Sequence, residues 1–412
     1  MPDPTRESAF ELLSAVLERR RSLDEALSSL PPQDARDRAA AHRLAASVLR
    51  RMGTLDAVLE PHLRRQPPEP VRLILRLGAA GLLLLGTPNH AAVATAVALA
   101  KRRGLTPFAG LINAVLRKVA TTGPQAMAEL DSPRLDTPSW LWASWGKEAR
   151  AIATAHQHEA PLDLTLQPGE PVPDGGQLLS TGSVRFPAGT AVASVPGFDT
   201  GRLWVQDAAA AIPARLLATQ PGELVADLCA APGGKTGQLA TTGASVVALD
   251  RDAHRVERLR GNLARWHLPA EVITADATTW RPPRLLDAVL LDAPCSATGT
   301  IRRHPDVLHL KRARDIAKMT ETQDALLAAA AAMLRPGGRL VYAVCSLQPE
   351  EGRPRIAAAI ARGGLRHEPF RSDELAALPE ALTPDGFLRT HPGLWPMTGG
   401  MDGFFAARLI RT

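Results

Sequence analysis

The feature that most constrains the fold is a regular alternation in the C-terminal half of the chain. From about residue 203 onward, short apolar runs with strand character alternate with Ala-rich stretches of helical character. The strand candidates are residues 224–228, 245–249, 271–274, 288–291 and 339–344. Strands that alternate with helices are typical of a doubly wound, largely parallel sheet, so we predict a Rossmann-like α/β domain over residues 201–412. In such sheets, functional sites lie at the carboxyl ends of the strands.

The N-terminal region has a different pattern. Between Glu7 and Lys118 apolar residues recur at helical spacing, with proline-rich breaks between them, which predicts an all-helical domain of about six or seven helices over residues 1–125. The longest apolar stretch, residues 77–100, is interrupted at Pro88, so we expect two buried helices and a turn rather than a membrane span. Residues 126–200 combine frequent Pro and Gly with short alternating runs, and predict a linker followed by a small mixed α/β element.

Charge and cysteine content narrow the possible partners and compartment. The 412-residue chain has a net charge of +6, and residues 1–120 hold 18 Lys plus Arg against 11 Asp plus Glu, so the basic excess belongs to the helical region. Such a region is either a solvated face or a nucleic-acid surface. The 3 cysteines are too widely separated for a disulfide framework or a zinc cluster, and the N-terminus lacks a signal-peptide pattern. We therefore expect a cytoplasmic protein with neither a metal nor a membrane segment. A monomer is the default expectation for a modular chain of this kind.

A Gly-rich turn follows the first predicted strand and precedes a helix. It contains Cys229, Ala230, Ala231, Pro232, Gly233, Gly234 and Lys235. Glycines let the backbone approach a ligand closely, although one such turn is weak evidence. The later strands end in Asp250, Asp276 and Asp292. A single strand-end Asp is more often a cap, but three of them in register with a Gly-rich turn favour a nucleoside site, with Asp250 facing ribose hydroxyls.

Two cysteines end neighbouring predicted strands. Cys295 follows Asp292 and Pro294, and Cys345 follows the run that ends at residue 344. A lone strand-end cysteine is usually structural, but two beside an acid suggest pyrimidine chemistry. Carbon 5 of a pyrimidine becomes nucleophilic only after a nucleophile adds at carbon 6, which suits a thiolate, and the charge at N3 needs an acid such as Asp292. The residues alone do not decide which cysteine attacks.

Three motifs in order carry a family resemblance: DLCAAPGGKT at 227–236, DAPCSATGTIRRHPD at 292–306 and YAVCS at 342–346. They resemble the RNA cytosine-5 methyltransferases of the RsmB/Sun (Fmu) family, and the helical region is similar to that family's NusB-like RNA-binding domain. The resemblance implies S-adenosyl-L-methionine bound by residues 229–235, Asp250, Asp276 and Asp292. It also implies Cys345 as the nucleophile, Cys295 as an aid to product release, and 16S ribosomal RNA as the substrate that yields 5-methylcytosine.

Some expectations stay open beside this resemblance. Arg302, Arg303 and His304 could meet phosphates that flank the target base, or could form a solvated loop. The same chemistry could act on transfer RNA or large-subunit RNA, because an RNA-binding fold does not specify which RNA is bound. A catalytically silent RNA-binding assembly protein is the alternative from another class. The chain departs from the family pattern at Val344, at Gly352 and at residues 164–166.

Overall fold

The computed structural model describes residues 3–412, which form two compact units. One unit contains the chain up to His158 together with Ile301–Arg312, and the other contains Glu159–Thr300 and Ala313–Thr412. Within residues 3–412, no helix combines the length and the apolarity that a membrane span requires. The domain boundaries that the sequence predicts at residues 125 and 200 remain predictions.

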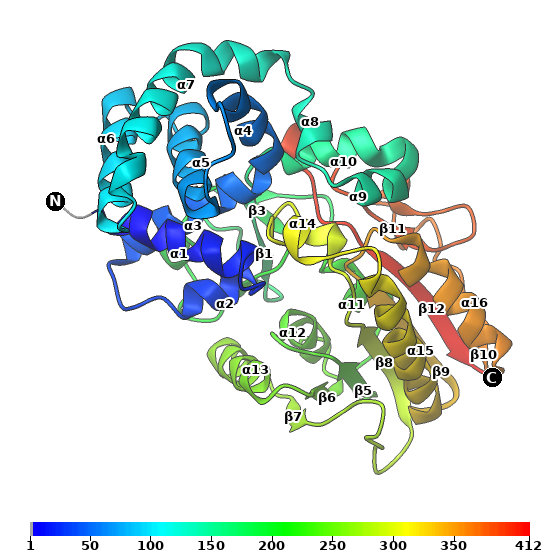
Figure 1. The fold of residues 1–412 in the computed structure, drawn as a ribbon. Helices are drawn as coiled ribbons and strands as arrows, with labels where there is room; N and C mark the ends of the chain where they lie inside the picture. Colours follow the sequence, from blue (N-terminus) through cyan, green and yellow to red (C-terminus); the bar gives the residue numbers. More distant parts are fainter. Residues whose placement is uncertain (1–2) are drawn as a thin grey trace. The chain divides into compact units, whose positions relative to one another are not determined.

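The first unit is helical (Figure 1). Its helices are α1 (Pro4–Leu17), α2 (Leu23–Ser28), α3 (Ala35–Arg50), α4 (Met52–Leu59), α5 (Glu69–Leu83), α6 (Asn89–Arg102), α7 (Ala109–Glu129), α8 (Ser132–Leu135), α9 (Ser139–Trp145), α10 (Ala149–His156) and α14 (Val307–Leu310). As predicted, the apolar stretch at 77–100 belongs to two helices, α5 and α6, separated by a turn that precedes Asn89. Their buried faces contribute Leu, Ile, Val and Ala side chains to one core. The apolar periodicity is therefore the signature of a bundle, as expected.

Two sheets build the second unit. A small antiparallel sheet has the order β2-β3-β1-β4 and consists of β1 (Leu162–Leu166), β2 (Gln177–Leu178), β3 (Val184–Phe186) and β4 (Leu203–Val205). The large sheet has the order β10-β12-β9-β8-β5-β6-β7, and β11 pairs with β12. Its strands are β5 (Leu224–Leu228), β6 (Ser245–Asp250), β7 (Glu271–Thr274), β8 (Leu286–Asp292), β9 (Leu334–Val344), β10 (Leu365–His367), β11 (Leu388–Arg389) and β12 (Phe405–Arg411).

The large sheet confirms the predicted α/β class. Strands β7, β6, β5, β8 and β9 run parallel, whereas β10, β11 and β12 pair antiparallel. The strand order reverses at β5, which has β6 on one side and β8 on the other. A sheet of this kind opens a crevice where the order reverses, beyond the carboxyl ends of the strands. The Gly-rich turn after β5 and the end of β8 both lie at that position.

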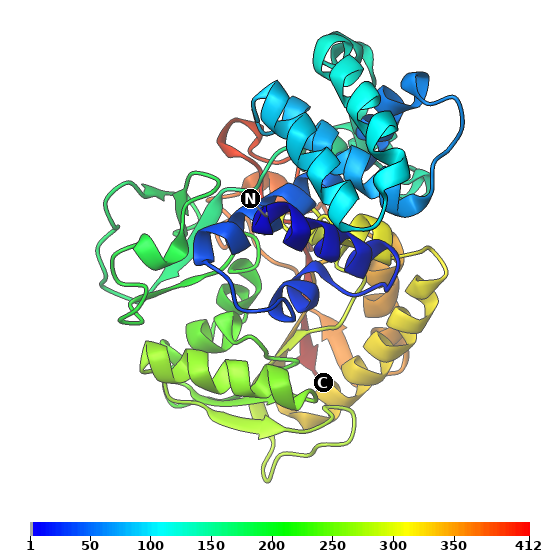
Figure 2. The same ribbon diagram turned by 60° about the vertical axis from the view of Figure 1, so that its left-hand side comes forward.

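Helices cover both faces of the large sheet (Figure 2). Side chains of α15 (Asp315–Met333) and α16 (Arg353–Ala361) share one apolar core with one face. Side chains of α11 (Ile212–Leu216) and α12 (Gly234–Ala240) share another core with the opposite face, and α13 (Ala253–Trp266) packs beside β6 and β7. Gly352, where the chain departs from the family pattern, does not prevent the formation of α16, which begins at the next residue. The two cores hold the strand ends in fixed positions.

Candidate active site

The turn from Cys229 to Gly233 connects β5 to α12, and its backbone conformation explains its composition. Gly233 has a φ of 108°, and a Cβ atom at this position would lie 2.5 Å from Cδ1 of Leu259 on α13. Cys229 also has a positive φ, 63°. The amide of Ala230 donates to the carbonyl of Leu249 at 2.8 Å, which fastens the turn to β6. Only glycine combines that φ with that close approach, so residue 233 cannot carry a side chain without strain.

Asp250 connects the turn to the next strand. Its side chain is buried at the end of β6, where one carboxylate oxygen accepts from the amide of Ala231 at 3.2 Å and the other accepts from the amide of Asp252 at 3.1 Å. The oxygen that accepts from Ala231 also forms an ion pair with Nη2 of Arg255 at 3.5 Å. A carboxylate oxygen has two lone pairs, so the oxygen that accepts from Asp252 can accept one further hydrogen bond from a ligand hydroxyl. The predicted ribose acceptor is therefore held rigidly in place by backbone donors.

A cavity of about 130 Å³ opens beside Asp250. Its lining includes Cys229, Asp250 and Asp276 from the predicted set, and apolar side chains such as Leu249 and Leu326. Hydrogen bonds from the hydroxyl and the amide of Thr278 lower the pKa of Asp276, so this carboxylate is ionised at neutral pH. Two carboxylates beside apolar walls fit the polar edges and the flat face of a nucleoside. The chemistry of these residues thus suits the adenosine part of the expected cofactor.

Helix α15 contributes a wall of this cavity that sequence reasoning missed. Thr322 and Leu326 line it, although both belong to an Ala-rich helical run with no distinguishing motif. The helical pattern indicated only that this segment would be buried against the sheet. Which of its residues would face a ligand depends on how the helix lies across the strand ends, and no local signal encodes that.

Lys235 and Asp292 form an ion pair at the end of β8. The Nζ of Lys235 donates to Oδ2 of Asp292 at 2.7 Å and lies 5.2 Å from the centre of the Phe404 ring. Burial disfavours the charged lysine, but the negative charge of Asp292 outweighs burial and raises the pKa of Lys235. A negative charge on Cys345 also raises the pKa of Lys235. An ammonium, a carboxylate and a thiol are therefore neighbours in one site.

The two predicted cysteines meet, with their Sγ atoms 3.5 Å apart. The hydrogen bond to Cys345, reinforced by burial, raises the pKa of Cys295 well above its ordinary value. The loop that contains Cys295 and the loop that contains Cys345 can come this close because residue 299 is a glycine. Its amide donates to the carbonyl of Cys345 at 3.0 Å, and the amide of Gly403 donates to the carbonyl of Gly299 at 2.8 Å. A Cβ atom on Gly299 would lie 1.9 Å from the carbonyl oxygen of Gly403.

Asp227, the first residue of motif DLCAAPGGKT, was not predicted as a site residue. Its side chain is fully buried in β5 and accepts from the hydroxyl of Thr236 at 2.6 Å. Burial raises the pKa of Asp227 to about 7, and the nearby charge of Asp292 adds to this effect. The carboxyl group of Asp227, which lies just before the Gly-rich turn, is therefore far less acidic than an ordinary aspartate.

The segment after the Cys295 motif corrects one expectation. Ile301–Arg312 belongs to the helical unit, in which the side chain of Arg302 is 1% exposed and its carbonyl accepts from Arg50 at 2.8 Å. A guanidinium buried in this way cannot reach a phosphate of bound RNA, so the expected phosphate contact is wrong for Arg302. The dense apolar packing of α1 and α3 around residues 301–312 could not be read from the motif itself.

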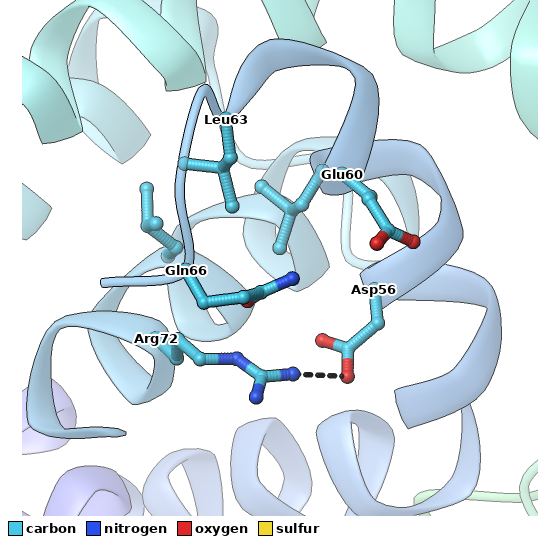
Figure 3. A pocket seen from close by; sticks show the side chains of 7 residues that line it. Asp56, Glu60, Leu63, Gln66 and Arg72 are labelled. Atoms are coloured by element: carbon cyan, nitrogen blue, oxygen red, sulfur yellow. Dashed lines mark hydrogen bonds and ion pairs between the residues drawn. The ribbon is translucent and has the colours of Figure 1, made fainter. Parts of the chain in front are cut away.

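The helical unit has a cavity of its own, of about 170 Å³ (Figure 3). Asp56, Glu60 and Gln66 point toward it, and Arg72 donates to Asp56 at 2.9 Å. Arg76, which is 4% exposed, donates two further bonds to Asp56. None of the residues predicted to bind cofactor or to react lines this cavity. The residues predicted to bind cofactor or to react all lie in the second unit.

Comparison with known families matches both units. Residues 214–410 match the family model described as 16S rRNA methyltransferase RsmB/F, and residues 3–121 match the model of the NusB family. The chain is 36% identical over 436 residues to ribosomal RNA small subunit methyltransferase B of Sodalis glossinidius, covering 98% of this chain and 96% of that protein. It is 37% identical over 393 residues to the protein of the same name in Xanthomonas campestris pv. campestris, covering 87% and 88%.

Solved structures share the fold. The crystal structure of a protein designated PH0851 covers 100% of this chain and 99% of that chain with a TM-score of 0.77 at 23% identity, a likeness that concerns the fold alone. A methyltransferase homologue from Pyrococcus horikoshii covers 69% of this chain and 96% of its own with a TM-score of 0.55 at 26% identity. The fold of the chain is therefore shared with a solved structure over its full length.

Proposed function

Because the chain belongs to the RsmB/F family of rRNA methyltransferases, we propose that it converts one cytosine of 16S ribosomal RNA to 5-methylcytosine through a covalent adduct with Cys345. S-adenosyl-L-methionine is the cofactor, and when bound it supplies the methyl group. We place its adenosine in the cavity beside Asp250 and Asp276, next to the turn formed by residues 229–235. The enzyme acts as a monomer in the cytoplasm, where ribosomal RNA is made.

The single observation that carries this proposal is the pair of sulfur atoms 3.5 Å apart beside the Lys235–Asp292 ion pair. Two thiols this close in a buried site do not both ionise, because the second negative charge is repelled by the first. The hydrogen bond to Cys345 and burial raise the pKa of Cys295, so Cys295 is the cysteine that keeps its proton. Lys235 is close enough to stabilise a negative charge on Cys345. Both observations support Cys345, the residue that the family resemblance implies, as the nucleophile.

The reaction then divides between four side chains. The thiolate of Cys345 forms a bond to carbon 6, and Lys235 gives a proton through its hydrogen bond to Asp292, which passes the proton to N3 as negative charge develops there. The resulting enamine places electron density on carbon 5, which takes the methyl group. Carbon 5 then loses its proton, the bond between carbon 6 and Cys345 breaks, and the ring regains its double bond.

Cys295 suits the last step because its acidity changes during the reaction. Its pKa is raised chiefly by the hydrogen bond to Cys345, and a sulfur bonded to carbon 6 no longer carries the charge that raises it. The pKa of Cys295 therefore falls once the adduct has formed. Once the Cys295 thiol has released its proton to water, its thiolate can accept the carbon 5 proton, and the thiol formed in this way can protonate Cys345 as it leaves.

A methyl-transfer assay tests the proposal. We expect the protein to transfer labelled methyl groups to 16S ribosomal RNA, and the product to be 5-methylcytosine at one position. The Cys345→Ala variant should be inactive, whereas Cys295→Ala should form the adduct and release it slowly. Methylation of transfer RNA or large-subunit RNA instead would change the substrate. Absence of transfer to any RNA would favour a silent assembly protein and reject the proposal.

A further inference from the structure

A buried carboxylate lies between the two loops that carry the cysteines. Glu351, at the end of a short 3-10 turn (Pro349–Glu351), has no exposed side-chain surface. Its Oε1 accepts from the backbone amide of Ser296 at 2.9 Å and from Nε2 of Gln323 at 2.9 Å. Its Oε2 accepts from the hydroxyl of Ser296 at 2.5 Å and from the hydroxyl of Ser346. Four donors thus converge on one carboxylate.

Three of these donors belong to the two residues that directly follow the cysteines. Ser296 follows Cys295 and Ser346 follows Cys345, and the two hydroxyl oxygens are 3.0 Å apart. Glu351 therefore binds both cysteine loops at the same time, one residue away from each sulfur. Charge-assisted hydrogen bonds of this kind are among the stronger ones in proteins, so the connection is stiff.

The surrounding elements hold the carboxylate in turn. Gln323 of α15 also donates to the carbonyl of Pro294 at 3.0 Å, and the hydroxyl of Tyr342 on β9 donates to the backbone carbonyl of Glu351 at 2.8 Å. Thr298 accepts from the amide of Leu347 at 3.0 Å, which adds a second link between the loops. A buried charge is tolerated only when it is well satisfied, and this one is. The network is therefore rigid and has one arrangement.

We propose that Glu351 is a positioning residue that sets the separation of the Cys345 and Cys295 sulfurs by holding Ser346 and Ser296 together. This inference rests on the proposed function, because the separation matters only if one sulfur attacks and the other assists. Glu351 acts through the two serines and is not itself a catalytic residue. Its charge has a second effect, since it contributes to the raised pKa of Cys295, after the hydrogen bond to Cys345 and burial.

Two substitutions separate geometry from charge. Glu351→Ala removes all four hydrogen bonds, so the loops lose their common anchor. Glu351→Gln keeps the shape: its carbonyl oxygen can still accept from the Ser296 amide and from Gln323, while its amide donates to the two serine hydroxyls. Glu374→Ala is the matched control, because Glu374 accepts bonds from Arg408 at 2.6 and 3.0 Å and takes no part in the cysteine network.

The measurement is the rate of adduct formation on 16S RNA that contains 5-fluorocytosine, with saturating RNA and cofactor and well below each variant's melting temperature. A misplacement of about 1 Å can slow a reaction roughly 100-fold, so we expect a loss of about that size for Glu351→Ala. Glu351→Gln should remain within about tenfold of the wild type, and Glu374→Ala should keep the wild-type rate. The dissociation constant of the cofactor should change by less than about threefold in all variants.

A second readout depends on charge. Glu351→Gln should shift the pH profile of Cys295 alkylation to lower pH in a Cys345→Ala background, which a merely structural role would not do. A folded Glu351→Ala protein that reacts at the wild-type rate would overturn the inference. Should Glu351→Ala not fold, Ser346→Ala takes its place, and a wild-type rate in that variant would overturn the inference equally. If the wild-type protein itself forms no adduct, the proposed function fails instead.

Discussion

Adding one methyl group at Gly299 should push the two cysteine loops apart. The Cβ of Gly299→Ala would lie 1.9 Å from the carbonyl oxygen of Gly403 and 2.9 Å from that of Cys345. Both neighbours are backbone atoms, which cannot rotate out of the way as a flexible side chain can. The loops must therefore separate, and the hydrogen bonds that Gly299 exchanges with Cys345 and Gly403 must lengthen or break.

The expected loss of stability follows from these contacts. Two buried hydrogen bonds contribute about 1 kcal/mol each, and overpacking a close-packed site costs roughly 1–3 kcal/mol more. We therefore expect the free energy of unfolding of the second unit to fall by about 3–5 kcal/mol. Even at temperatures where the variant is folded, the displaced Cys345 should form adduct about 100-fold more slowly.

Urea denaturation and the 5-fluorocytosine adduct assay measure the two effects. Gly261→Ala is the matched control, because Gly261 lies on the exposed side of α13 and a Cβ there would meet no atom within 4 Å. Alanine is the better helix former, so this control should be stabilised by about 0.5–1 kcal/mol and keep full activity. If Gly299→Ala were as stable and as reactive as the control, the close approach of the two loops would not be needed for the chemistry.

Four further substitutions test the buried carboxyl group of Asp227, the cofactor site and the RNA-binding surface. Burial raises the pKa of Asp227 to about 7, so the stability that this group contributes is complete below about pH 4 and is lost as the pH rises through 7. Asp227→Asn should remove this pH dependence of the free energy of unfolding, measured by denaturation at a series of pH values. An unchanged pH profile in the variant would contradict the raised pKa. Asp250→Asn should weaken cofactor binding about tenfold, as measured by calorimetry, because one carboxylate oxygen is replaced by an amide group that donates toward the Ala231 amide. An unchanged affinity would place the ribose elsewhere. Arg64→Glu and Lys118→Glu, both on exposed side chains of the helical unit, should weaken RNA binding and flatten its salt dependence, and equal salt slopes would exclude that surface.

Much of the fold could be predicted because its signals are local. Each strand of the parallel sheet is a short apolar run, and the predicted 224–228 and 271–274 agree with the bounds of β5 and β7. The glycine at 233 and the acid at 250 follow from the strand-to-helix turn and from the next strand end. The predicted run 339–344 covers only the second half of β9, which begins at Leu334, because Pro336, Gly337 and Gly338 resemble a loop in sequence.

The parts of the site that could not be predicted depend on contacts between distant segments. Ser296 and Glu351 are 55 residues apart, and no pattern of spacing indicates that a carboxylate in one loop will anchor the other. Arg302 looks like a phosphate ligand in its motif but is buried among helices that precede it by about 250 residues, as its bond from Arg50 shows. Residue types near the cysteines thus indicated the chemistry, and only the packing shows which of them can reach a substrate.

The most direct test of the central claim is to locate the covalent bond. The protein is incubated with S-adenosyl-L-methionine and 16S RNA that contains 5-fluorocytosine, digested with protease and nuclease, and the modified peptide is sequenced by mass spectrometry. Fluorine at carbon 5 cannot leave as a proton does, so the adduct should persist. We predict that the nucleotide is attached to Cys345. Attachment to Cys295, or methylated product without any protein-bound nucleotide, would contradict the assignment of Cys345 as the nucleophile.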